Sequence, residues 1–117
     1  MSTPIVRHQS GPIMSSAVEY NGMVFLTGLI AEDTSKGVRA QTEQILAKID
    51  ALLATCGSDR SRLLSATIYL DDIRDKEEIN KAWQAWMKPE HAPARACVQA
   101  SLATSATLVE IMAIAAG

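Results

Sequence analysis

Residues 38–57 read VRAQTEQILAKIDALLATCG and carry the strongest structural signal in the chain. Their apolar residues recur in steps of one and three, which lays a stripe along one face of a helix. The stripe consists of Ile45, Leu46, Ile49, Leu52, Leu53 and Cys56. Gly57 follows at once and fits a left-handed C-terminal cap. The pattern therefore predicts an amphipathic helix over residues 38–56, with one face packed on another layer.

A second amphipathic helix is predicted over residues 76–87. Asp75 and Glu78 have the spacing of a capping box at its start. Pro89 disfavours helical geometry at the residue before it and so marks the end. Apolar residues at helical spacing, including Ile79, share one face of this helix, so it too needs a layer to cover.

Short β-rich segments surround the two helices. Asn21-Gly22, between two of them, is the strongest short hairpin signal. Strands are predicted over residues 5–8, 17–20, 23–29, 63–70, 94–101 and 109–115. Because each helix has one apolar face, we predict an α+β two-layer sandwich in the order β-β-β-α-β-α-β-β, with both helices on one face of a mixed sheet. Its strand–helix–strand crossovers should be right-handed and join parallel neighbours.

The composition is that of an ordinary globular protein. Hydrophobic residues make up 48% and charged residues 21% of 117 residues, which fits one domain over residues 1–117. No apolar run reaches the roughly 18 residues that span a membrane, and no signal segment is visible, so we expect a cytoplasmic protein with reduced thiols. The net charge of −2 makes nucleic acid an unfavoured partner. Cys56 and Cys97 have no metal-ligand spacing, and we expect no metal site.

The second face of the sheet also needs a cover. In the last strand, alternation places Glu110 with Met112 on one side, and Val109 with Ile111 on the other. The outer face then mixes apolar residues with single charges, which is more typical of a subunit contact than of free surface. We therefore expect an oligomer.

Arg95 and Glu110 are the residues best suited to chemistry. Each is a lone charge in an apolar or small-residue strand, where an unpaired charge is costly. A structural ion pair between them is one interpretation. The other is a small-molecule site, because the planar guanidinium of Arg95 matches a carboxylate bidentately and Glu110 can act on water.

Three further residues could line such a site. Cys97 shares a strand face with Arg95, and without a histidine at catalytic spacing it fits a pocket wall better than a nucleophile. Asn80 lies on the second helix, where a solvated side chain is the alternative interpretation. The hydroxyl of Thr27, next to Gly28, could also reach a pocket. The sequence has no common nucleotide-binding or metalloenzyme motif.

The C-terminal segment resembles the signature of the RidA/YjgF family. The stretch PARACVQ at residues 93–99 is followed by VEI at residues 109–111, at the family's spacing. The Asn21-Gly22 hairpin and the two helices also fall in family order, so the resemblance covers nearly the whole chain. Within the family the chain looks closest to the YoaB-like branch, through NKAWQAW at residues 80–86.

This resemblance implies a chorismate-mutase-like fold and a homotrimer with ligand clefts between subunits. Active relatives hydrolyse reactive 2-imino acids and their enamine forms to 2-oxo acids and ammonia, as hydrolases of C=N bonds, without a metal or organic cofactor. Carried over, Arg95 would hold the substrate carboxylate, and Glu110 would orient or deprotonate the attacking water. Cys97 would line the water site, chiefly through its backbone. Asn80 would support the cleft, and Thr27 stands in place of a family serine.

The chain departs from the active relatives at residues 11–14, Gly-Pro-Ile-Met, where those relatives have a tyrosine after Gly-Pro. Met14 would line the cleft instead. The alternative expectation is therefore a non-catalytic trimer that binds small carboxylates such as 2-oxo acids. A third expectation comes from other relatives, which are described as cleaving RNA or as holding other proteins in the manner of a chaperone. The acidic net charge disfavours binding to RNA.

Overall fold

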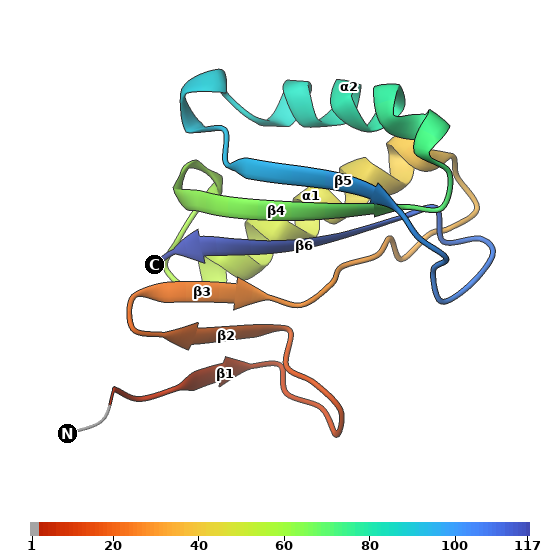
Figure 1. The fold of residues 1–117 in the computed structure, drawn as a ribbon. Helices are drawn as coiled ribbons and strands as arrows, with labels where there is room; N and C mark the ends of the chain where they lie inside the picture. The colour runs from red at the N-terminus through yellow and green to blue at the C-terminus, as the bar shows by residue number, and fades with distance from the viewer. Residues whose placement is uncertain (1–2) are drawn as a thin grey trace.

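Residues 3–117, the part of the chain that this computed structural model describes, form one mixed sheet and two α-helices (Figure 1). The sheet order is β1-β2-β3-β6-β4-β5. The elements, in chain order, are β1 (Val6–His8), β2 (Ala17–Tyr20), β3 (Met23–Leu26), α1 (Val38–Thr55), β4 (Leu63–Leu70), α2 (Lys76–Trp86), β5 (Ala94–Gln99) and β6 (Val109–Ala116). Both helices lie on one face of the sheet, so the predicted α+β two-layer fold is confirmed.

The last strand occupies the middle of the sheet. β6 pairs antiparallel with β3 on one side and with β4 on the other. The crossover through α2 joins β4 and β5 as parallel neighbours, as predicted. The crossover through α1 does not join neighbours, because β6 lies between β3 and β4. That part of the prediction is wrong, and the reason is that a strand distant in sequence fills the gap.

The local turn and cap predictions have mixed outcomes. Asn21 and Gly22 both have positive φ, 52° and 77°, as a primed hairpin turn requires. Gly57 also has a positive φ, 73°, and follows the end of α1. The capping box is wrong, because the chain enters α2 from a 3₁₀ turn and the Asp75 side chain makes no capping hydrogen bond. Asp72 instead accepts from the backbone N–H of Arg74 and caps that turn.

Two strands end earlier than predicted. β3 stops at Leu26, although the backbone N–H of Thr27 still donates to the carbonyl of Ser16. Leu29 rejoins the sheet through a single bridge to Ile111. β5 stops at Gln99, whose side chain accepts from the N–H of Ile73.

The core lies between the helices and the inner face of the sheet. α1 buries Ile45, Ile49 and Leu53, which are fully covered, and β6 buries Val109 and Ile111. The periodicity of residues 38–56 therefore marks the buried face of α1 correctly, and the helix ends at Thr55, one residue before the predicted end. No helix of residues 3–117 is long and apolar enough to cross a membrane.

The outer face of the sheet has no helical cover and carries exposed apolar side chains. Phe25, Val98 and Met112 have exposed fractions of 38%, 42% and 46%. Cross-strand register puts Val98 and Glu110 on this same face, because both pair with Tyr69. An apolar sheet face of this extent is typical of an interaction surface.

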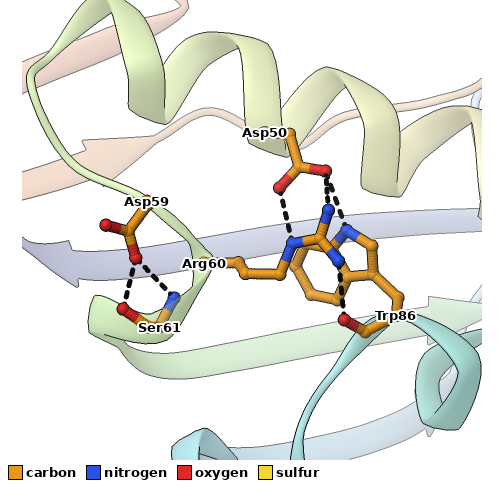
Figure 2. Close-up of polar contacts among 5 residues, drawn as sticks. All are labelled: Asp50, Asp59, Arg60, Ser61 and Trp86. Carbon is orange, nitrogen blue, oxygen red and sulfur yellow. Dashed lines mark hydrogen bonds and ion pairs between the residues drawn. The ribbon is translucent and has the colours of Figure 1, made fainter.

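A cluster around Arg60 ties the two helices together (Figure 2). The Arg60 guanidinium donates to Asp50 of α1, from Nε at 3.0 Å and from Nη2 at 2.6 Å. It also donates to the carbonyl of Trp86 at the end of α2 and lies 4.8 Å from that ring's centroid. The Trp86 indole N–H donates to the same Asp50 carboxylate at 2.9 Å. Asp59, drawn beside them, accepts from Ser61 and caps its own turn, and these bonds lower the pKa of Asp59.

Replacing Asp50 with alanine should destabilise the fold. Asp50→Ala leaves the guanidinium and the indole N–H without their shared acceptor, and we expect a loss of about 1–2 kcal/mol in unfolding free energy, since the pair is partly exposed. Urea denaturation measures the change. Glu43→Ala, which removes a weak 3.9 Å pair with Arg39 on the same helix, is the matched control and should stay close to wild type. Equal losses in both variants would contradict a special role for Asp50.

Candidate functional site

Arg95 lies on β5, the edge strand, and its side chain turns toward the helix layer. It pairs in register with Ala66, which is 3% exposed and belongs to the inner face. Its Nη2 donates to the Asn80 side-chain oxygen of α2 at 2.6 Å, and its guanidinium carbon lies 5.2 Å from the Trp83 ring centroid. Two residues one helical turn apart thus hold the guanidinium from one side.

The Arg95 guanidinium keeps donors for a further partner. The ion pairs formed by residues 3–117 do not include Arg95. Its hydrogen-bonding partner in the chain, Asn80, is a neutral amide. A guanidinium has five N–H donors in a planar fork, so a carboxylate ligand can still be bound by this group.

Glu110 lies on β6 and faces the other side of the sheet. Its strand neighbours Val109 and Ile111 are fully buried under the helices, while Glu110 is only partly covered. Its carboxylate packs over Gly28, so closely that a methyl group added there would overlap a carboxylate oxygen and lie 3.0 Å from Cδ. A residue with a side chain at position 28 would therefore move the carboxylate.

Thr27 and Met14 meet beside this glycine. The Thr27 hydroxyl donates to the Met14 sulfur at 3.6 Å, and Thr27 is the chain neighbour of Gly28. The segments 14–16 and 27–29 are further tied by the backbone bond from Thr27 to Ser16. Met14 has an exposed fraction of 55%, which leaves its side chain available for contact with a ligand or a second chain.

Arg95 and Glu110 therefore belong to two separate candidate half-sites. One half-site holds Arg95, Asn80 and Trp83 on the inner side of the edge strand; the other holds Glu110 and Gly28 on the outer face. The structural ion pair between Arg95 and Glu110, one of the two sequence interpretations, is wrong, because strand alternation and register direct them to opposite faces. A hollow of about 290 Å³ at the start of β5 is lined by Arg95 but not by Glu110.

Cys97 follows Arg95 on the same inner face, as alternation predicts. It pairs with Ile68 in register and packs against the core. Its sulfur makes no hydrogen bond with any histidine of residues 3–117, which fits a structural or lining role better than a nucleophile.

Sequence reasoning missed two contributions. Trp83 is buried in the core, and its ring also lies against the guanidinium of Arg95. The available signal was its spacing of three residues from Asn80. The close contact between Gly28 and the Glu110 carboxylate had no signal in the sequence. It depends on how the segment after β3 folds back onto β6.

The fold is that of the chorismate-mutase-like α+β proteins, and comparison with known proteins gives the family. The chain belongs to the RidA/YjgF family: residues 9–117 match the family described as "Endoribonuclease L-PSP". It is 41% identical over 112 residues to the "RutC family protein YoaB" of Escherichia coli, covering 96% of this chain and 97% of that protein.

Solved structures and a more distant relative agree with this assignment. A YjgF-family protein from Neisseria meningitidis superposes with a TM-score of 0.93 at 42% identity, covering 97% of this chain and 94% of that one. The "Reactive Intermediate Deaminase A, chloroplastic" of Arabidopsis thaliana is 31% identical over 107 residues, covering 86% of this chain and 57% of that protein. The sequence-based assignment to the family, with a YoaB relative, is therefore confirmed.

The contact between Gly28 and Glu110 can be tested by adding one methyl group. Gly28→Ala should displace the Glu110 carboxylate in a crystal structure of the variant. The unfolding free energy should change by less than about 1 kcal/mol, because the atom displaced is the end of a flexible side chain. Gly37→Ala, where nothing lies within 4 Å of the added carbon, is the control. If the carboxylate of Glu110 does not move in Gly28→Ala, the absence of a side chain at position 28 is not what determines its position.

Proposed function

We propose that the protein hydrolyses reactive 2-imino acids, and their enamine forms, to 2-oxo acids and ammonia. The observation that carries the proposal is the Arg95 guanidinium, oriented by Asn80 and Trp83 and free of any carboxylate partner in residues 3–117. A fixed, unneutralised guanidinium suits the carboxylate that every 2-imino acid carries. The name of the Arabidopsis relative supports the same chemistry.

The reaction needs little beyond two positioned groups. Arg95 binds the substrate carboxylate and fixes the orientation of the neighbouring C=N carbon. Glu110 accepts a proton from a water molecule, whose oxygen then bonds to that carbon as the C=N π electrons move to nitrogen. Return of that proton to nitrogen makes ammonia the leaving group. The C–N bond then breaks as the C=O bond of the 2-oxo acid forms, and the hydroxyl proton passes to the Glu110 carboxylate and from there to solvent. Water is the only co-reactant, and the protonated imine is electrophilic enough without a cofactor.

The two half-sites require a cleft between copies of the chain. Arg95 and Glu110 face opposite sides of the sheet in one chain, so one substrate can meet both only if they come from different subunits. The apolar outer face around Phe25 and Met112 supplies a surface for such an assembly. We propose the homotrimer that the family resemblance implies, with three equivalent clefts.

Single substitutions should separate binding from proton transfer. We expect Glu110→Gln to lower kcat by on the order of 10²–10⁴-fold, since it removes the base and keeps the shape. Arg95→Ala should mainly raise KM, with Asn80→Ala giving a smaller change in the same direction. The assay is 2-oxo acid release from enzymatically generated imines. Arg74→Ala, at an exposed ion pair, is the control. Full activity in both Arg95→Ala and Glu110→Gln would refute the proposal.

Mixing the two impaired variants should restore activity. In a trimer that contains both Arg95→Ala and Glu110→Gln chains, a cyclic arrangement leaves one cleft with both wild-type side chains. Trimers co-expressed with two different tags, and purified on both, should therefore show about one third of wild-type activity. At a substrate concentration below the wild-type KM, each variant alone should show only a small fraction of that activity. Absence of recovery in mixed trimers of confirmed composition would show that the two residues act within one chain or not together.

A non-catalytic carboxylate-binding role is the second candidate. The observation that favours it is Met14, whose thioether rather than a phenol contacts Thr27. Calorimetry with 2-oxobutanoate separates the two functions. Binding that depends on Arg95, with no imine hydrolysis by wild-type protein, would favour the binding module.

A further inference from the structure

Three potential metal ligands meet at a place remote from the two half-sites. His8 of β1, Glu19 of β2 and Cys56, just after α1, each direct one ligand atom to a common point, all within 4.8 Å of one another. The His8 Nε2 and the Glu19 carboxylate lie 2.5 Å apart. All three residues are partly buried, with side-chain exposures of 20% for His8 and 32% for Glu19. Among the His, Cys, Asp and Glu side chains of residues 3–117, these three form the one group of three or more whose ligand atoms lie this close together.

Backbone structure fixes this arrangement. Register pairs His8 with Ala17 and Val6 with Glu19, so His8 and Glu19 are diagonal neighbours on the face that carries the buried Ala17. Cys56 is placed by the end of α1, where its N–H donates to the carbonyls of Leu52 and Leu53. Ser58, two residues later, donates from Oγ to the carbonyl of Ala116 and anchors this end of the helix to β6.

From this geometry we infer that His8, Glu19 and Cys56 form a zinc-binding site, with a fourth position left for water. Zinc accepts imidazole nitrogen, thiolate sulfur and carboxylate oxygen, at about 2.0–2.3 Å. Such bond lengths around a tetrahedral ion separate the ligand atoms by about 3–4 Å, within the range that these side chains already span. The His8–Glu19 hydrogen bond opens as the ion enters. The mixed N, O and S set excludes magnesium and calcium, which prefer oxygen alone.

The proton balance of binding is simple. Burial and the nearby Glu19 carboxylate raise the pKa of the Cys56 thiol, so binding of the ion has to displace the thiol proton. His8 must bind through a neutral ring nitrogen.

A metal titration of the whole chain tests the inference. Zinc added to chelator-treated protein should bind one ion per chain in competition with a chromophoric indicator. Cobalt(II) should bind the same site and give a thiolate-to-metal charge-transfer band together with intense visible bands of a tetrahedral ion. We expect Cys56→Ser to abolish the charge-transfer band. His8→Gln and Glu19→Gln should each weaken zinc binding at least tenfold.

The chain supplies its own matched controls. It has two cysteines and two histidines, so Cys97→Ser and His91→Gln remove the same ligand types outside the cluster and should bind zinc like wild type. Alkylation of wild-type protein gives a readout that needs no variant: zinc should slow modification of Cys56, mapped by mass spectrometry, and leave Cys97 unchanged. The inference is overturned by wild-type protein that binds no stoichiometric zinc, by equal protection of both thiols, or by binding that survives in folded Cys56→Ser and His8→Gln.

Discussion

The central place of β6 is the constraint on which the remaining structure depends. This strand pairs with both β3 and β4 and so joins the N-terminal hairpin to the strand–helix–strand unit. Four of its residues face the helices and are at most 2% exposed: Val109, Ile111, Ala113 and Ala115. The register of β6 against β3 and β4 therefore decides which side chains of the sheet enter the core. The buried side chain of Gln41 secures its start, because it accepts from the Leu108 N–H and donates to the Ala106 carbonyl. A buried amide with every partner present specifies one position rather than several.

The same strand also fixes the position of Glu110. With alternate residues of β6 committed to the core, Glu110 has to lie on the outer face, where Gly28 leaves room for it. The edge strand β5 is registered against β4 so that Arg95 lies on the inner side, within reach of α2. Two charges are thus held on opposite faces of one sheet, each in a partly covered place. In the function that we propose, each chain supplies one part of a site, and the exposed apolar outer face is the surface through which copies associate.

Sequence reasoning predicted the features that depend on local pattern. The stripe in residues 38–56 gave α1 and its buried side, and Asn21-Gly22 gave the hairpin, because helix periodicity and turn conformation are set by neighbours in the chain. The insertion of β6 between β3 and β4 was missed, since pairing between distant strands leaves no local mark. For the same reason, alternation showed which residues share a face with Arg95 within its strand, and which share a face with Glu110 within its own. It could not show whether the two side chains lie on the same face of the sheet or on opposite faces. The meeting of His8, Glu19 and Cys56 also depends on tertiary placement alone.

The identity of residue 80 sets the charge next to the Arg95 guanidinium. Asn80 offers a neutral oxygen at 2.6 Å, so it orients the guanidinium without cancelling its charge. An aspartate there would form an ion pair with Arg95 and compete with an incoming carboxylate for the same donors. The Trp83 ring acts in the same sense, because a cation–π contact holds a cation while leaving the in-plane N–H groups free. Arg60 shows the contrasting arrangement. The Asp50 carboxylate accepts hydrogen bonds from two of its guanidinium nitrogens, so the charge of Arg60 is neutralised in a contact that joins the two helices. The two arginines differ in whether a carboxylate already occupies the guanidinium, and that difference is why we propose Arg95, and not Arg60, as the group that binds the substrate carboxylate.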